Sequence, residues 1–508
     1  MGFKRYKADA DNTIVNAFKP DLSTRGTGSN AGMADILETF SIYGRETTSS
    51  QELSRILVKF PISTISTDRS NSVVPASGSV SFYLRMFNAP HSKTVPKDYK
   101  LIVAAVSQSW QEGNGLDLEG YKDVTSGNTG SNWMSASNTA KWTSVGGDYL
   151  TGSDYLYNQS FTKGLADLEV NITPLVERWI ASDVGNYGVG VHFTSSNEAY
   201  FSSSTGQNSG SLIDNTAGAT VSYYTKRFFA RGSQFFFSRP VLEARWNSTI
   251  KDDRALFYYS SSLAPAADNL NTIYLYNYVR GRLVNIPSVG TGSILVSLYS
   301  GSSQDTAPSG SKLTLYDSNN NITGGYVSTG IYSCSIGITA ASTPVKTLYD
   351  VWHSGSTQYF TGSIKPKSLT GYQTMTATKP TYYLNITNLK PKYTNKETAR
   401  FNLYVRDKNW SPTIYTVANS NIATTSIISA SYRVFRIIDA LEVVAHGTGS
   451  DFHTGLSYDL SGNYFDFDMK SLDPGYGYAF KFSFYDQQLK SWIEQDETFK
   501  FRVESYEY

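Results

Sequence analysis

The stretch YAFKFSF at residues 478–484 places an aromatic ring at every second position, with small or charged residues between the rings. Because side chains alternate between the two faces of a β-strand, this pattern predicts a strand with one buried face. Similar short runs, rich in aromatic and β-branched residues, recur at residues 79–87, 100–106, 235–237, 272–279, 293–299, 382–386 and 401–405. Clusters of Gly, Asn, Asp, Ser and Pro separate these runs. The sequence therefore predicts an all-β protein of several β-sandwich or jelly-roll domains.

One segment departs from this period and predicts a short helix. Residues 172–180 read ITPLVERWI, with Thr173 as the expected N-cap and Pro174 at the first helical position, where proline is tolerated. The apolar side chains at positions 175, 176, 179 and 180 would then share one face of the helix. We expect one or two short helices in the whole chain.

Composition excludes several classes of protein. The chain has 508 residues, enough for about three domains of roughly 150 residues. Lys and Arg number 44 and Asp and Glu 43, so the net charge of +1 argues against nucleic acid and membranes as partners. Only 17% of the residues are charged and 14% are aromatic, which is unlike a coiled coil or a disordered tail.

Targeting signals are not evident in the sequence. Residues 1–30 lack the apolar block of a signal peptide, and no run of about 18 apolar residues occurs. We therefore expect synthesis in a cytoplasm without a Sec-type export signal.

Breaks in the strand pattern predict the domain organisation. A Gly-, Ser-, Thr- and Asn-rich arm would occupy residues 1–34, and we expect it to be ordered only against a neighbouring protein. A first β-domain would span residues 35–250, a second residues 251–366 and a third residues 367–508.

Residue types that commonly carry catalysis are scarce. The chain has one cysteine, Cys334, which we expect to be a buried apolar side chain. Its five histidines form no H-x-x-x-H pair, and no G-x-S-x-G motif is present. We expect no enzymatic activity, no catalytic or metal-ligating residues and no cofactor.

A few clusters could nevertheless carry chemistry. Carboxylates that could hold calcium gather at Asp117, Glu119 and Asp123 and again at Asp466 and Asp468, without the spacing of a known calcium loop. We interpret them as solvated acids. Ser356 lies near His353 and Asp350, but such neighbours in a strand usually bond to backbone groups.

Aromatic residues and arginines leave three interpretations open. Rings near predicted loops could fill the cores, form protein interfaces or stack on sugars; they are Trp110, Trp133, Trp142, Tyr121, Tyr149, Tyr155 and Tyr157. Arginines near strand ends would suit pairing with acids at subunit contacts, or they could be ordinary surface residues; they are Arg45, Arg55, Arg85, Arg231, Arg239 and Arg245.

Several short motifs in the first half, in this order, resemble the DNRLRE-type jelly-roll family. They are SRILVKF at 54–60, WQEG at 110–113, VNITPLVERW at 170–179, NYG at 186–188, and FFARGS at 228–233 followed by RPVLEA at 239–244. The sequence Ala230-Arg231-Gly232 departs from the family's usual Ser-Arg-Glu. The resemblance implies a jelly-roll domain.

Longer strings are similar to virion structural proteins of large tailed phages, especially marine and cyanobacterial myoviruses. They lie at residues 11–18, 35–44, 268–277 and 349–355. The resemblance implies a non-enzymatic accessory or adaptor protein of the virion, in several copies, bound to other virion proteins at the tail, baseplate or neck rather than the head. The alternative is a carbohydrate-binding module of a host-recognition fibre, with a host glycan as partner.

Overall fold

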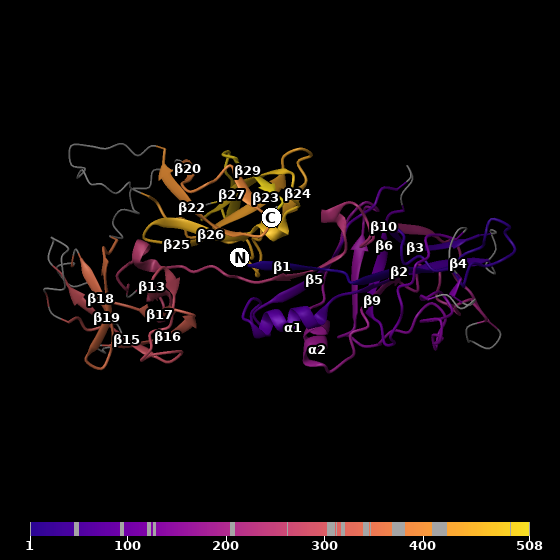
Figure 1. Ribbon diagram of the computed structural model, residues 1–508, viewed down its shortest axis with the longest axis horizontal. Coiled ribbons are helices and arrows are strands. Elements are labelled where there is room, and N and C mark those ends of the chain that lie inside the picture. The colour runs from indigo at the N-terminus through magenta and orange to yellow at the C-terminus, as the bar shows by residue number, and fades with distance from the viewer. Residues whose placement is uncertain are drawn as a thin grey trace. The chain divides into compact units, whose positions relative to one another are not determined.

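A computed structural model of the chain describes residues 2–44, 50–91, 96–118, 123–124, 129–203, 209–261, 263–301, 310, 312–315, 321–338, 345, 347–367, 381–408, 424–487 and 489–506 (Figure 1). Strands make up 45% of the chain and helices 7%, so the all-β prediction is confirmed. The chain forms two units, Gly2–Asn247 and Ser248–Tyr508. No helix of the described residues is long and apolar enough to cross a membrane.

The first unit is built from two antiparallel sheets. The smaller sheet has the order β1 (Phe3–Lys7), β11 (Val241–Arg245), β5 (Ser81–Met86), β8 (Leu168–Asn171). The larger has the order β10 (Tyr223–Phe229), β3 (Ile36–Tyr43), β4 (Gln51–Lys59), β9 (Val189–Phe193), β6 (Tyr99–Ala105), β7 (Leu156–Phe161), and β2 (Ala10–Asn16) also pairs with β4. Buried apolar side chains of both sheets share one core, among them Phe82 and Leu84 from β5 and Ile56 and Val103 from the larger sheet. This arrangement is a β-sandwich.

Residues 3–16 were predicted to lie in an N-terminal arm, but they form strands of these two sheets. β1 pairs with β11, from Phe3 opposite Arg245 to Lys7 opposite Val241. β2 pairs with β4 along its whole length. The polar composition suggested an arm, but Asp11, Asn12 and Asn16 are buried and hydrogen-bonded to residues far along the chain. Their polar groups are satisfied within the protein, so the segment needs no neighbour to be ordered.

Two α-helices lie side by side in the first unit (Figure 1), and Arg69 of α1 (Ile62–Ser70) pairs with Glu177 of α2 (Thr173–Ala181) at 2.6 Å. α2 is the predicted helix, and Leu175, Val176 and Trp179 are buried. The N-cap of α2 is Ile172 and not Thr173. The Thr173 hydroxyl instead accepts a hydrogen bond from the Phe82 amide at 2.7 Å. α1 was not predicted, because only Ile62 and Ile65 of its nine residues are buried and no apolar stripe marks it.

The first sheet of the second unit has six antiparallel strands. Their order is β12 (Asn271–Tyr276), β17 (Ile331–Ile336), β16 (Ile322–Ser328), β15 (Ile294–Ser300), β18 (Leu348–Ser354), β19 (Thr357–Ile364). A separate hairpin joins β13 (Tyr278–Val279) to β14 (Arg282–Leu283). Trp352 and Tyr332 are fully buried in the core of this sheet.

The second unit also holds two sheets from the C-terminal part of the chain. One has the order β20 (Tyr382–Ile386), β22 (Thr398–Asp407), β26 (Gly462–Asp468), β25 (Ser457–Asp459). The other has the order β21 (Lys392–Thr394), β29 (Phe499–Glu504), β27 (Gly477–Asp486), β23 (Ala430–Arg436), β24 (Glu442–Val444), and β28 (Ser491–Glu494) also pairs with β27.

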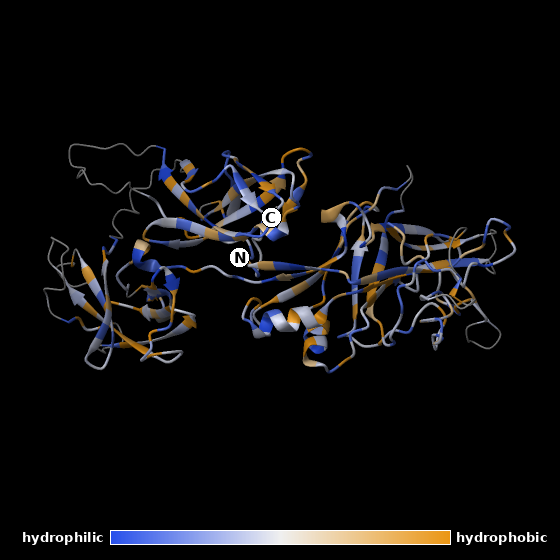
Figure 2. Ribbon diagram, in the orientation of Figure 1, coloured by the Kyte–Doolittle hydropathy of each residue, from blue (hydrophilic) through white to orange (hydrophobic). Residues whose placement is uncertain are grey.

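Aromatic rings form the core between these two sheets. Tyr432 stacks on Phe465 with ring centroids 4.5 Å apart, and Phe480 stacks on Phe501 at 4.7 Å. The predicted strand at residues 478–484 lies in β27, and its four rings are buried as expected. Its other face is more covered than predicted, because Ala479 and Ser483 are buried too. Hydrophobic and hydrophilic residues alternate along many of the strands, as Figure 2 shows.

Candidate functional site

A cleft in the first unit is the best candidate for a binding site. Its volume is about 750 Å³, and we call it the Asp148 cleft. The loop at residues 143–151 lines it together with Arg55, Ser107, Gln108 and Ile213. The loop contributes the hydroxyls of Thr143, Ser144 and Thr151, the carboxylate of Asp148 and the ring of Tyr149.

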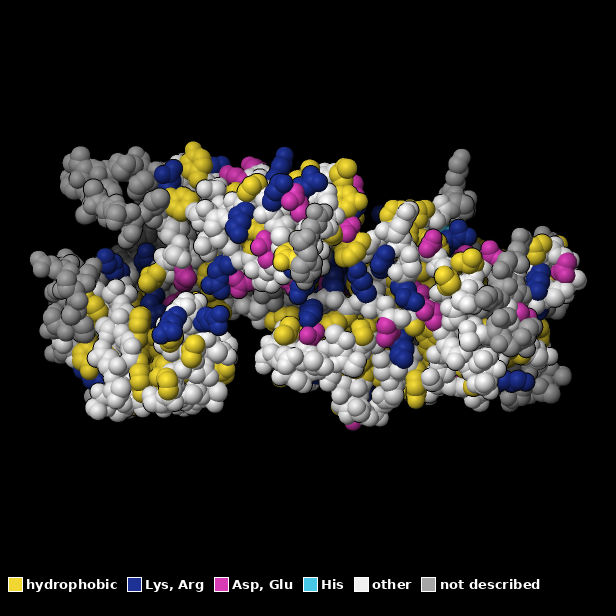
Figure 3. Space-filling model, in the orientation of Figure 1, with side chains coloured by type: hydrophobic (Ala, Val, Ile, Leu, Met, Phe, Trp, Pro, Cys, Tyr) yellow, Lys and Arg dark blue, Asp and Glu magenta, His cyan; other side chains and the backbone are white. Residues whose placement is uncertain are grey.

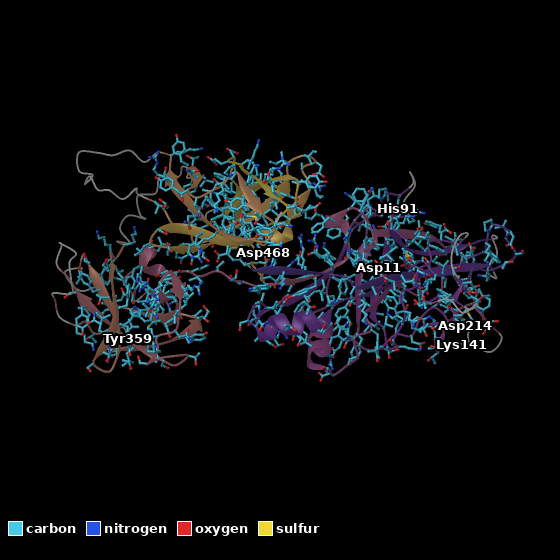
Figure 4. All side chains as sticks on the ribbon, in the orientation of Figure 1. Asp11, His91, Lys141, Asp214, Tyr359 and Asp468 are labelled. Carbon is cyan, nitrogen blue, oxygen red and sulfur yellow. The ribbon has the colours of Figure 1, made fainter. Side chains whose placement is uncertain are left out.

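Hydrogen bonds to Asp148 hold this loop in place. The carboxylate accepts hydrogen bonds from the Thr143 and Ser144 amides, each at 2.8 Å. The backbone oxygen of the same residue accepts one from the Ser107 amide at 3.0 Å, just after β6. The Gln108 side chain donates to the backbone oxygen of Lys141, which Figure 4 labels, at 3.1 Å. The cleft is therefore built on the end of a core strand.

A buried ion pair lies beneath the cleft. The Arg55 guanidinium, from β4, contacts both carboxylate oxygens of Glu198 at 3.0–3.3 Å and donates to the Gly146 backbone oxygen at 3.2 Å. Burial alone would lower the pKa of Arg55, but the adjacent Glu198 charge outweighs burial and raises it. Arg55 is thus a permanent cation already paired inside the protein.

The half-buried rings of His192 and Tyr149 lie beside this ion pair. Burial, reinforced by the Arg55 charge, lowers the pKa of His192 to about 4, so its ring is neutral at pH 7. Burial raises the pKa of Tyr149 to about 12, and its hydroxyl donates to the Gly146 backbone oxygen at 3.0 Å. Both rings keep their neutral forms at physiological pH, so this cluster acts as a fixed support for the cleft.

Of the residues in and around the cleft, the sequence pattern indicated Arg55 and Tyr149 but not Asp148, Glu198 or His192. Glu198 lies 143 positions from its partner Arg55 along the chain, and no local pattern connects them. The signal for Asp148 is its place directly after Gly146-Gly147, a pair typical of a tight turn.

The predicted strand-end arginines pair mainly with acids of their own chain. Glu243 is buried in the smaller sheet and contacts Arg5, Arg85 and Arg245 at 2.6–3.4 Å. Burial would raise the pKa of Glu243, but the three guanidinium groups hold it well below its usual range. Arg239 donates to the Ser233 backbone oxygen at 2.8 Å, and Arg45 lies outside the described residues. The described arginines therefore stabilise the unit itself.

A second charged cluster joins β2 to two of the sequence motifs. Arg231 pairs with Glu112 through two hydrogen bonds of 2.5 and 2.6 Å. The Arg231 amide also donates to the Asp11 carboxylate at 2.6 Å, and the Asp11 amide donates to Glu112 at 2.9 Å. Burial, reinforced by the Glu112 charge, raises the pKa of Asp11 to about 7. Asp11 is labelled in Figure 4.

Other sequence motifs of the first unit also contact one another. The Trp110 indole donates to the Tyr187 backbone oxygen at 2.7 Å, and the Asn186 amide donates to the Phe60 backbone oxygen at 2.9 Å. Gly188 has φ +79°, and a Cβ there would lie 2.2 Å from the Val58 oxygen. Only glycine adopts this positive φ without strain and also leaves room for the Val58 oxygen.

The three tryptophans that the sequence places near loops belong to a hydrophobic core. Trp110, Trp133 and Trp142 are 9%, 0% and 5% exposed and pack together with residues of β2 and β4. Tyr155 and Tyr157 pack against the main core, and Tyr121 lies outside the described residues. Of the described aromatic candidates, Tyr149 alone lines the cleft.

The fold does not bring together Asp350, His353 and Ser356, which are close in the sequence. Asp350 faces the core of the second unit and pairs with the buried Arg254, whereas His353 contacts the Ser297 hydroxyl at 2.8 Å. Positions 350 and 353 point to opposite faces of β18, and no hydrogen bond links either residue to Ser356 in the described structure. Burial raises the pKa of Cys334, in the same core, to about 12.

The two carboxylates of the second cluster considered for calcium have other contacts. Asp466 forms an ion pair with Arg400 at 2.8 Å, and Asp468, labelled in Figure 4, accepts a hydrogen bond from the Lys470 amide at 3.0 Å. Glu119 lies outside the described residues. Within the described parts of the chain, no three His, Cys, Asp or Glu side chains are grouped so that they could hold a metal ion.

Comparisons with known proteins assign no family. No protein-family model matches the chain, and no curated protein matches it. One solved structure with a partial likeness is the native conformation of Escherichia coli alpha-2-macroglobulin, with 6% identity and a TM-score of 0.15. The alignment covers 88% of this chain but 21% of that protein, so the chain spans about a fifth of its length.

Proposed function

We propose that this chain is a non-enzymatic structural protein of a tailed-phage particle, an adaptor that docks onto other virion proteins at the tail, baseplate or neck. Two features support the proposal. Four strings of the sequence are similar to phage virion proteins. The ion pairs around Glu243 and Glu198 lie inside the first unit, so these charges are paired within the chain.

An exposed apolar tip in the second unit carries the proposal. The turn between β23 and β24 holds Ile437, Ile438 and Leu441, and Tyr476 lies beside it, since the Ile437 amide donates to the Gly477 oxygen at 2.9 Å. Ile438 is 78% exposed, and the other three side chains are exposed as well. We call these four residues the apolar tip.

Charged neighbours fix the shape of the apolar tip. The Arg436 guanidinium pairs with Asp439 and lies 4.9 Å from the centre of the Tyr476 ring. Apolar residues flanked by an arginine and a tyrosine are typical of the centre of a protein interface. On the face shown in Figure 3, apolar side chains are mixed with charged and polar ones. The tip is therefore suited to docking on another protein.

Incorporation into particles tests this proposal. We expect the Ile438→Asp variant to fold normally, because the side chain is exposed, but to enter particles about tenfold less, since a charge in an interface core costs at least about 1.4 kcal/mol of binding. The matched control is Leu489→Asp, which changes an exposed leucine elsewhere in the same unit. Equal incorporation of both variants, measured by quantitative mass spectrometry, would contradict a docking role for the tip.

A further inference from the structure

We propose that the Asp148 cleft binds a short segment of an uncharged saccharide chain. This inference does not depend on the particle role: a chain that docks without binding sugar would keep the first proposal and lose this one. It rests on the polar groups, charge, apolar surface and rigidity of the cleft.

The cleft presents several polar groups with no partner in the described structure. The hydroxyls of Ser107, Thr143, Ser144 and Thr151 form no hydrogen bond within the described residues. The side-chain oxygen of Gln108 also accepts none there. Each hydroxyl can both donate and accept, which matches the hydroxyl groups of a sugar, since these also do both. A ligand rich in hydroxyl groups would satisfy this set.

The charge of the cleft disfavours anionic ligands. Asp148 forms no ion pair among the described residues, so its carboxylate, held by two amides, faces the cleft with its charge uncompensated. The cation of the cleft, Arg55, is already paired with Glu198 at 3.0 Å. A phosphate, sulfate or uronic acid would therefore meet repulsion without a free positive partner. A neutral sugar hydroxyl could instead donate to Asp148.

Apolar surface lies among these polar groups. Val145, Ile213 and the ring of Tyr149 line the same cleft. Sugar rings carry C–H groups that pack against such surfaces, while a few polar groups fix the orientation of the ligand. The volume of about 750 Å³ falls within the range of roughly 300–1,000 Å³ typical of small-molecule sites, which suits a few sugar units.

The cleft is also held rigid before any ligand binds. A Cβ at Gly147 would lie 2.6 Å from the Tyr149 hydroxyl, and one at Gly190 would lie 2.2 Å from its ring, so these glycines leave room for that ring. The Leu150 amide donates to the Ala105 oxygen at 2.9 Å, which ties the loop to β6. A preformed site loses less entropy on binding.

The experiment uses the full chain on an array of neutral and acidic glycans. Saturation-transfer NMR then follows with the tetrasaccharides of the glucose, xylose, mannose and N-acetylglucosamine series and with tetragalacturonate. The test variant is Thr143→Val/Thr151→Val, which removes two exposed hydroxyls at constant shape. The matched control is Thr162→Val, an exposed threonine outside the cleft. A circular dichroism spectrum confirms the fold of each variant.

We expect binding to at least one neutral glycan, with an affinity that falls about tenfold or more in the double variant and stays unchanged in Thr162→Val. Three results would overturn the inference. They are silence across the whole array, neutral-glycan binding that the double variant retains, and binding of tetragalacturonate as strong as that of the neutral sugars.

Discussion

The buried carboxyl of Asp11 makes the stability of the first unit dependent on pH. Its side chain is 1% exposed, and its pKa is raised from 3.8 to about 7, chiefly by burial. Between these two values the unfolded chain loses this proton and the folded chain keeps it. The unfolded state then binds fewer protons, so the free energy of unfolding must fall as the pH rises from about 4 to 7.

The Asp11→Asn variant isolates this effect, because an amide can still accept from the Arg231 backbone amide but does not titrate. From pH 5 to pH 7 the wild type crosses about two pH units at about 1.4 kcal/mol each, or about 3 kcal/mol. For a unit of this size that amounts to a Tm change of roughly 6–12 °C. We therefore expect the Tm of Asp11→Asn, measured relative to that of the wild type, to rise by this amount between pH 5 and pH 8.

Differential scanning calorimetry at pH 5, 6, 7 and 8 measures the gain. The control is Asp21→Asn, because hydrogen bonds from the Thr24 and Ser23 amides hold the Asp21 pKa well below its usual range. Its ionisation therefore does not change between pH 5 and pH 8. A constant Tm difference between Asp11→Asn and wild type across this range, or one that shrinks with pH, would refute the reasoning.

Three further tests concern the first unit, each measured by urea unfolding, and two of them include a control variant. Glu198→Ala leaves the buried Arg55 without its counter-charge and should cost about 3–5 kcal/mol; a loss below about 1 kcal/mol would show that water reaches the pair. Ser182→Gly should raise the free energy of unfolding by about 1 kcal/mol, because Ser182 ends α2 with φ +64°. Ser182→Ala keeps the left-handed strain and should leave the free energy of unfolding unchanged. Gly188→Ala places a Cβ 2.2 Å from the Val58 oxygen and should cost several kcal/mol, whereas Gly78→Ala, at φ +86° with open space around it, should cost about 1 kcal/mol; equal losses would contradict the steric argument.

The features predictable from the sequence are local ones. Alternating rings in residues 478–484 identify a strand because burial on one face leaves a period of two. Pro174 and the apolar residues after it identify α2 in the same way. The cap was misplaced because the Thr173 hydroxyl bonds to Phe82, a residue 91 positions away. Such a contact leaves no trace in the local pattern.

Composition misled where polar residues are buried. Asn12 looks like a loop residue, yet its side-chain amide donates to the backbone and side-chain oxygens of Ser131 at 3.0 and 2.8 Å inside the first unit. Asp11 and Asn16 behave likewise, so the N-terminal residues form strands rather than an arm. A buried polar residue with all its partners distant in sequence resembles an exposed one when only the sequence is read.

The candidate site depends almost wholly on such distant contacts. Arg55 was noted as an arginine in a strand, but its role as a support appears only with Glu198 in place. Asp148, Ser107 and Ile213 come from three separate segments that the fold brings together. The sequence therefore predicted the class of fold, and the geometry of the cleft had to come from the structure.

Mass spectrometry of purified phage particles tests the central proposal most directly. We predict that peptides of this chain occur in gradient-purified particles, at a constant ratio to the major tail or baseplate proteins, and that they resist high-salt washing. Its absence from particles, with the protein present in the lysate that produced them, would contradict a structural role in the virion.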